Sequence, residues 1–408
     1  MMLRASSSLA LLSLFTFSGC ELFSVSAPTS TPMEKDYGRS LADGEVALEL
    51  VTDRSQYPDF GLGFGRKDDL LLAVDRTLEY FAKPSSKRWW PYKDHEGKFS
   101  IDHERALASL HAFRKVLTES SSGAELNQKI ADNFDVFRSK GWNRQGEVLF
   151  TGYCQPIYDA SPTQSGEYRY PLYRLPPELK KEEFTGTPLG WEQGGSLGSS
   201  PKRAEFDGGY LNGRGLELYW LKSRLETYIV QVQGSARLRM QDGSMRAVGY
   251  AGKTEHEYKG LGSTLVEEGK VSKNKLSLRA IKDYFAQHPD QVDPYTQKNE
   301  SYVFFTDITG GPYGSLNIEV TPYRTLATDK AVFPRGGVCF TQTKVPMRGG
   351  INETFNQFML DQDTGGAIRS AGRGDIFIGT GDEAEEIAGG TYAEGKLWYI
   401  YLKPGANP

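Results

Sequence analysis

Four aspartates lie close together near the end of this chain and could carry acid/base chemistry. Asp361, Asp363, Asp375 and Asp382 fall within residues 358–390, separated by glycines and short apolar runs. Glycine allows positive φ and close approach to a ligand, so carboxylates on such turns indicate an acid/base site on a small β-barrel. A calcium loop and aspartates that cap turns are the alternatives. The spacing does not fit the EF-hand pattern, which makes turn capping the stronger alternative.

Three further motif blocks precede this segment. They are TGYCQP with YPLYRLP (151–156, 170–176), VQGSARL with DGS and GYAGK (232–238, 242–244, 249–253), and SYVFF with TPYRTLA (301–305, 321–327). Followed in order by DTGGAIRSAGRGDIFIGTGDEAEEIAG (363–389), they resemble the membrane-bound lytic murein transglycosylase A (MltA) family, with its C-terminal aspartate-rich 3D domain. Cys154 stands where the family usually has a second tyrosine.

The resemblance implies a reaction that needs one acidic residue. The family cleaves the MurNAc–GlcNAc β-1,4 bond of peptidoglycan and leaves a 1,6-anhydro ring, because the C6 hydroxyl of the substrate attacks the anomeric carbon. One carboxylic acid can protonate the leaving oxygen and then accept the hydroxyl proton. Asp375, in GRGDIF, matches the catalytic position of the family. Its pKa must be raised, which the apolar residues 376–378 favour and Arg373 opposes.

The other aspartates are expected to support the site. Asp363, in DTGGAI, is expected to accept backbone N–H bonds from the glycine turn and to hold the shape of the barrel. Asp382 has the same expected role, with lining of the site as the alternative. Asp361 stays unassigned.

The matched blocks also contain side chains suited to binding a sugar chain. The expected substrate-binding residues are Tyr153, Gln155, Tyr170, Gln233, Ser235, Tyr250 and Lys253. No metal and no organic cofactor are implied. The implied partners are peptidoglycan glycan strands and other proteins of cell-wall synthesis or turnover. Two alternative functions stay open: a non-catalytic peptidoglycan-binding lipoprotein, and a glycan hydrolase in which a second base activates water.

The N-terminus is typical of a targeting segment. Arg4 precedes an apolar run from Leu9 to Phe17 that is too short to span a bilayer, and a small-residue step leads to Cys20. This pattern predicts a signal peptide over residues 1–19 and a lipid on Cys20; an ordinary signal peptide is the alternative. Glu21 in place of aspartate favours the outer membrane, with the protein facing the periplasm. Residues 20–55 are expected to form a flexible tether.

Composition limits the function and the number of domains. A chain of 408 residues exceeds the size of most single domains, and a net charge of −4 without a long basic run argues against a nucleic-acid binder. Besides Cys20, only Cys154 and Cys339 are present, either as a disulfide or as two buried thiols.

Hydrophobic periodicity predicts mainly β structure with accessory helices (α+β). Helices are expected over 68–82, 101–117, 123–140 and 276–288, and strands in VLFTGYCQPIY, LELYWL, ETYIVQVQG and ARLRM. Six later strands, YVFF, LATDKAVF, GVCFTQT, NQFMLD, DIFIG and LWYIYL, suit a closed barrel at about 300–405, double-psi-like by resemblance. We expect an all-β domain over 150–250, inserted into a discontinuous domain of 56–149 plus 251–408, with a cleft between the two.

Overall fold

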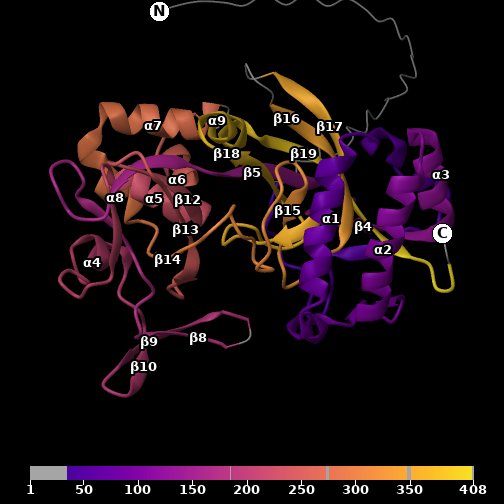
Figure 1. The fold of residues 1–408 in the computed structure, drawn as a ribbon, viewed down its shortest axis with the longest axis horizontal. Helices are drawn as coiled ribbons and strands as arrows, with labels where there is room; N and C mark the ends of the chain where they lie inside the picture. The colour runs from indigo at the N-terminus through magenta and orange to yellow at the C-terminus, as the bar shows by residue number, and fades with distance from the viewer. Residues whose placement is uncertain (1–34, 184, 273–274, 347–350, 407–408) are drawn as a thin grey trace, which may run out of the picture. The chain divides into compact units, whose positions relative to one another are not determined.

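The computed structural model describes residues 35–183, 185–272, 275–346 and 351–406 (Figure 1). From Asp36 onward the chain forms one compact unit. The predicted signal peptide and Cys20 lie outside the described residues. Within the described ranges, no helix is both long enough and apolar enough to cross a membrane.

A closed six-stranded barrel forms the centre of one of the two domains, as expected. Its strands follow the order β19–β16–β17–β15–β18–β5, and β19 pairs back with β5 to close it. The strands are β5 (Val148–Gln155), β15 (Thr325–Ala327), β16 (Val338–Pro346), β17 (Asn352–Asp363), β18 (Arg373–Thr380) and β19 (Tyr392–Leu402). Four of the expected strands lie in β16–β19. LATDKAVF contributes only its first residues, to β15.

Two expectations for the barrel and the helices around it are wrong. The helix expected over 123–140 ends early, because α3 (Gly123–Asn133) is followed by strand β4 (Phe134–Ser139). β4 pairs with β19 and with β1 (Leu48–Leu50), and Phe134, Val136 and Phe137 are buried there. The expected barrel strand YVFF lies in β14 (Val303–Asp307), which belongs to another sheet. Its place in the barrel is taken by β5, which comes from before the insertion.

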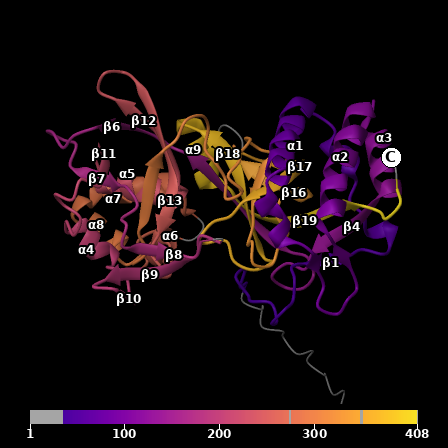
Figure 2. The same ribbon diagram turned by 60° about the horizontal axis from the view of Figure 1, so that its bottom comes forward.

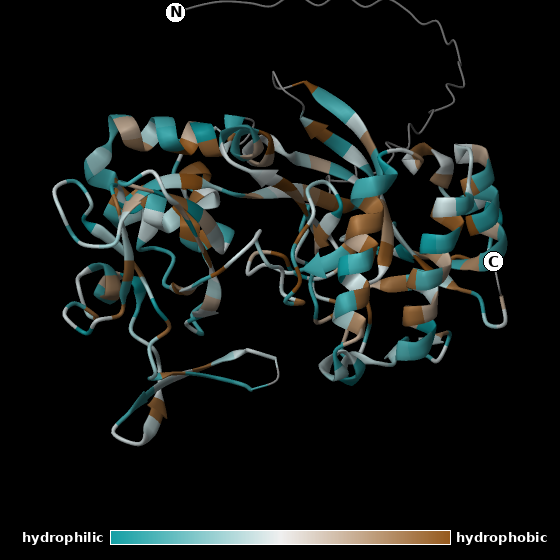
Figure 3. Ribbon diagram, viewed as in Figure 1, coloured by the Kyte–Doolittle hydropathy of each residue, from teal (hydrophilic) through white to brown (hydrophobic). Residues whose placement is uncertain are grey.

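Three amphipathic helices cover the barrel. α1 (Lys67–Phe81), α2 (His103–Glu119) and α3 carry alternating apolar and polar faces, visible in Figure 3. α1 packs against β17, and α2 packs against β19. Leu70, Val74, Leu110 and Phe113 are buried with the barrel residues in one core. A short hairpin, β2 (Tyr92–Lys93) and β3 (Ser100–Ile101), joins α1 to α2.

The inserted region is a six-stranded sheet in the order β14–β13–β12–β6–β11–β7. Its other strands are β6 (Ile157–Ser161), β7 (Tyr170–Tyr173), β11 (Glu217–Leu221), β12 (Ser235–Met240) and β13 (Met245–Lys253). The expected boundary at 250 falls inside β13, and β14 lies well beyond it. A smaller sheet contains β8 (Leu179–Lys181), β9 (Pro188–Gln193) and β10 (Ser196–Gly198).

The inserted region also contains helices, so the expectation of an all-β domain is wrong. ETYIVQVQG, expected as a strand, lies in helix α5 (Arg224–Gln233). The hydroxyl of Ser223 caps its first turn, and Gly234 ends it at a φ of 77°. Figure 2 shows this sheet surrounded by α4 (Arg203–Asp207), α5, α6 (Leu261–Glu267), α7 (Leu278–Gln287) and α8 (Val292–Thr296). The helix expected over 276–288 is α7.

The insert and the barrel meet at helix α9 (Asp382–Gly390), which follows β18. Glu385 on α9 accepts a hydrogen bond from Tyr158 on β6 and forms an ion pair with Lys282 on α7. α9 also packs against β5 and α7. These contacts fix the insert to the barrel strands β5 and β18, and β18 contains Asp375.

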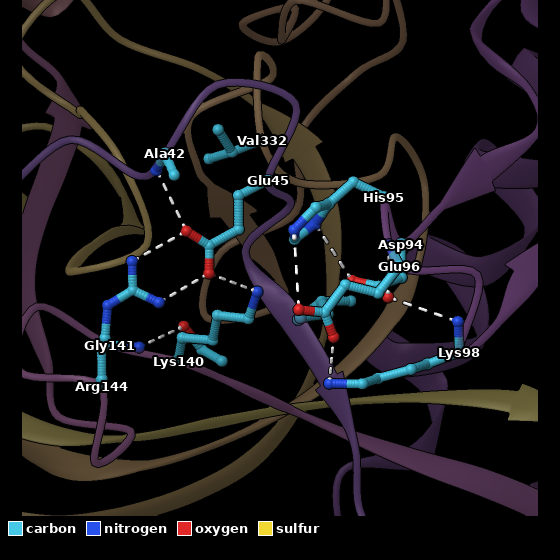
Figure 4. A network of polar contacts seen from close by, with 12 residues as sticks. Ala42, Glu45, Asp94, His95, Glu96, Lys98, Lys140, Gly141, Arg144 and Val332 are labelled. Atoms are coloured by element: carbon cyan, nitrogen blue, oxygen red, sulfur yellow. Dashed lines mark hydrogen bonds and ion pairs between the residues drawn. The ribbon is translucent and has the colours of Figure 1, made fainter.

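The segment Asp36–Ala47, here called the N-terminal strap, is bound to the barrel. Glu45 accepts hydrogen bonds from Lys140, Arg144 and the backbone N–H of Ala42 (Figure 4). Ala47 donates from its backbone N–H to the carbonyl of Val332. The flexible tether expected over 20–55 therefore does not extend through this segment, because a buried carboxylate with two cationic partners anchors it.

Candidate active site

The short strand β15 places two of the four aspartates at the same level of the barrel. Ala327 is the register partner of Asp363 on β17 and of Asp375 on β18. The two carboxyl groups therefore come from the strands on either side of β15. They are close enough that the charge of Asp363 raises the pKa of Asp375.

Asp375 has the surroundings that an acid catalyst requires. Its Oδ1 accepts a hydrogen bond of 2.8 Å from the hydroxyl of Thr151, its register partner on β5. The carboxyl side chain is partly accessible, while Ile376, Phe377 and Ile378 after it are buried. Burial raises the pKa of Asp375 to about 6, in the direction expected from the sequence. Such a group can both donate and accept a proton near neutral pH.

Arg373 opposes this shift without cancelling it. Its guanidinium donates to the carbonyl of Ala367 at 2.8 Å and to the hydroxyl of Thr151 at 3.4 Å. Its charge lowers the pKa of Asp375, as does the Thr151 hydrogen bond, but burial outweighs both. Thr151 therefore lies between the cation and the acid and contacts each.

Asp363 is held by three donors. Its Oδ1 accepts the backbone N–H groups of Ser315 and Thr364, both at 2.8 Å, and its Oδ2 accepts the hydroxyl of Tyr153 at 2.8 Å. Backbone donors were expected, although they come from a serine and a threonine and not from the glycines. Burial raises the pKa of Asp363, and these donors oppose the rise.

Asp361, which the sequence left unassigned, is completely buried in the barrel. Its carboxylate accepts hydrogen bonds from the hydroxyls of Thr328 and Tyr399 and forms an ion pair with Lys330. Burial raises the pKa of Asp361, and the charge of Lys330 and these hydrogen bonds oppose the rise. Thr328 also donates its backbone N–H to the carbonyl of Asp363 at 3.1 Å, so this buried network supports the strand end that holds Asp363.

Asp382 lies outside the barrel strands that contain the other three aspartates. It is exposed and lies in the first turn of α9, together with Glu383 and Glu385. Negative charge is favourable at a helix N-terminus. This position accounts for an aspartate there without a direct contact to Asp375.

Three residues expected to bind substrate are buried or bond to other parts of the protein. Gln155 is fully buried and accepts hydrogen bonds from Arg237 and Thr380. The side-chain oxygen of Gln233 accepts the backbone N–H of Cys154 at 3.0 Å. Ser235 is buried at the start of β12. Gln155 and Ser235 are therefore buried in the interior of this structure.

The remaining candidates are more open. The ring of Tyr153 packs against Phe377 beside Asp363, with the ring centroids 5.2 Å apart. Tyr250 is 50% exposed on β13. Lys253, at the end of β13, is partly buried beside the turn that follows Asp363. The ring of Tyr170 stacks with the guanidinium of Arg224 at 5.0 Å, so one of its faces is already covered.

The sequence did not single out Thr151, Ser315 or Thr328. Thr151 opens the TGYCQP block, so the motif contained it, but its contact with Asp375 depends on the pairing of β5 with β18. Nothing in the sequence marks Ser315. Cys154 and Cys339 are both buried free thiols, which settles the alternative left open for them.

Comparison with known proteins agrees with this architecture. The family model described as the MltA specific insert domain matches residues 149–306, and the 3D domain model matches residues 324–401. The insert match includes most of β5, which is a strand of the barrel. We therefore propose that the inserted domain begins after β5 and extends to residue 306, and that β5 and the segments on either side of the insert form the discontinuous domain.

Named relatives cover most of the chain. Membrane-bound lytic murein transglycosylase A of Escherichia coli K12 is 31% identical over 293 residues, 70% of this chain and 74% of that protein. The Vibrio cholerae protein of the same name is 31% identical over 268 residues, 64% of this chain and 68% of that protein.

Solved structures show the same fold. A membrane-bound lytic murein transglycosylase from Agrobacterium tumefaciens has a TM-score of 0.72 at 28% identity, covering 88% of this chain and 99% of that one. E. coli MltA with bound chitohexaose has a TM-score of 0.67 at 24% identity, covering 90% and 98%. The chain belongs to the membrane-bound lytic murein transglycosylase A family.

Proposed function

We propose that this protein is a peptidoglycan lytic transglycosylase. It cleaves the β-1,4 bond between MurNAc and GlcNAc without water and leaves a 1,6-anhydromuramoyl end. Family membership supports the reaction class. The observation that carries the mechanism is the partly accessible carboxyl group of Asp375, whose pKa is raised to about 6.

The reaction uses Asp375 twice. As a carboxylic acid, Asp375 protonates the glycosidic oxygen while the bond to the anomeric carbon breaks. As a carboxylate, it then accepts the proton of the C6 hydroxyl, whose oxygen forms the new bond to that carbon. The proton count closes, because Asp375 returns to its starting form. Thr151 orients the carboxyl group, and Asp363 favours its protonated form.

Mass spectrometry of digested peptidoglycan tests this function. Wild-type protein is expected to release anhydro-muropeptides, and Asp375→Asn is expected to release none while retaining its fold. Asp68→Asn, which changes an exposed aspartate on α1, is the matched control and should behave as wild type. Reducing-end products, one water heavier, would contradict the non-hydrolytic reaction. Anhydro products from a clean Asp375→Asn preparation would exclude Asp375 as the catalyst.

We also propose that the protein is anchored in the outer membrane by a lipid on Cys20 and faces the periplasm. The small residues before Cys20 support lipid attachment, and curated relatives carry the name membrane-bound. Glycan strands are its proposed substrate and partner. The proposed contacts are the five candidates that are at least partly accessible: Tyr153, Tyr170, Gln233, Tyr250 and Lys253.

A further inference from the structure

Lys253 brings a positive charge from the insert to the catalytic side of the barrel. It is the last residue of β13 and pairs with Val303 on β14. Its Nζ lies 3.8 Å from the position that a Cβ would occupy on Gly366. Gly366 belongs to the turn after Asp363, and Tyr258 approaches the same position at 3.9 Å. Lys253 therefore faces the turn that supports the proposed site.

Among the described residues this ammonium group has no neutralising partner, unlike three other lysines whose side chains are at least partly buried. Lys140 pairs with Glu45, Lys282 with Glu385, and Lys330 with Asp361. Lys253 has no ion pair and no hydrogen bond to any residue in the described ranges. Taking a charge out of water is unfavourable unless an opposite charge or a hydrogen-bond acceptor compensates.

A second cation, Arg369, lies in the loop that contains Gly366. Burial lowers the pKa of Lys253, and the charge of Arg369 lowers it further. Arg369 is exposed and follows Gly366 in the same loop, which continues to Arg373. Two like charges that converge from different parts of the fold repel each other. An anion bound between them would relieve this repulsion and would supply the missing partner of Lys253.

Only one of the two sugars of a glycan strand carries such an anion. GlcNAc is neutral, whereas muramic acid bears a lactyl group that ends in a carboxylate or, when substituted, continues into a peptide with its own carboxylates. We propose that Lys253 and Arg369 form a carboxylate-binding site that recognises the muramic acid side of the strand. This inference rests on the proposed function and specifies which feature of the substrate is read.

Binding measurements in an Asp375→Asn background test the proposal without turnover. The probes are strands stripped of stem peptides, strands that keep them, and chitin oligomers, which have no carboxylate. Lys253→Met and Arg369→Gln should each weaken binding of a carboxylate-bearing strand by about tenfold and leave chitin binding unchanged. Lys253→Arg should restore affinity, and Lys115→Met on the exposed side of α2 should have no effect.

The pattern of losses identifies the carboxylate. A loss confined to stripped strands assigns the lactyl group, and a loss confined to peptide-bearing strands assigns the stem peptide. Equal weakening toward chitin, or unchanged affinity in both Lys253→Met and Arg369→Gln, would overturn the proposal. Because Arg369 is exposed, its variant tests the site even if Lys253→Met fails to fold. Selective binding together with a failure of the wild-type protein to release anhydro-muropeptides would refute the proposed reaction and leave this site standing.

Discussion

At the residue scale, the acidity of Asp375 depends on its contact with Thr151. The proposed reaction starts from protonated Asp375, so kcat/KM should fall as pH rises above about 6. The Thr151 hydroxyl lowers the pKa of Asp375, because it donates to the carboxylate. Thr151→Val should therefore move the fall in kcat/KM to higher pH, by about one unit if the bond is worth about 1.4 kcal/mol.

Thr151→Ser is the control for this prediction, since it keeps the hydroxyl. Its pH profile should match the wild type. A Thr151→Val profile that keeps its midpoint, or moves toward lower pH, would show that this hydrogen bond does not set the acidity of the catalyst.

The buried ion pair between Asp361 and Lys330 should affect the free energy of unfolding more than the binding of substrate. Lys330→Met or Asp361→Asn leaves the other group buried without its partner, which typically costs about 3–5 kcal/mol. The double variant should lose less than the sum of the single losses, because neither charge is then left alone. Urea denaturation measures these differences. Additive losses would mean that the two groups do not stabilise each other.

At the element scale, the N-terminal strap depends on Glu45. Its cationic partners hold the pKa of Glu45 well below the ordinary value. Its contribution to stability is therefore present above the unfolded-state pKa and is lost as pH falls through the lower folded-state value. Glu45→Gln should remove both ion pairs and increase hydrogen exchange at the backbone amides of residues 36–47 at pH 7.

Glu96→Gln provides the comparison. Glu96 pairs with exposed Lys98 in the neighbouring network of Figure 4 and makes none of the contacts that hold the strap. It should leave exchange in residues 36–47 unchanged. If Glu45→Gln exchanges at the wild-type rate, the strap is held by its other contacts, such as Ala47 with Val332.

The spacing of apolar residues along the chain predicted most elements. It failed where tertiary contacts favoured a different structure. Phe134 and Phe137 continue the helical spacing of α3, and the pairing of β4 with β19 and β1 determines that they form a strand. In α5, the β-branched residues of ETYIVQVQG favoured a strand, while capping by Ser223 and burial of Ile229 and Val230 favour the helix. Tertiary contacts decided both cases.

The same limit applies to the site. Asp375 could be chosen from its motif, and the direction of its pKa shift from its apolar neighbours. Thr151 and Ser315 could not, because each reaches an aspartate more than forty residues away through strand pairing or a loop. Gln155 has the right chemistry for a sugar, but its burial depends on how β5 packs.

At the scale of the whole molecule, attachment at Cys20 has a direct test. Cys20→Ala removes the proposed lipid-bearing sulfur, so the protein should move from the outer-membrane fraction to the soluble periplasmic fraction. Its activity on isolated peptidoglycan should be retained, because no described part of the site depends on the lipid. Cys154→Ala is the control and should still pellet with membranes. Continued pelleting of Cys20→Ala would contradict the lipid anchor.

If Cys20 carries the proposed lipid, the length of chain before the strap sets how far from the membrane the protein can reach. Sixteen residues, Cys20 to Lys35, precede Asp36, from which the chain belongs to the catalytic unit. Because each residue spans at most about 3.5 Å, Asp36 can lie no more than about 55 Å from a lipid-bearing Cys20. Cutting would then be confined to the layer of wall nearest the membrane, and adding residues before Asp36 would deepen that layer without altering the chemistry.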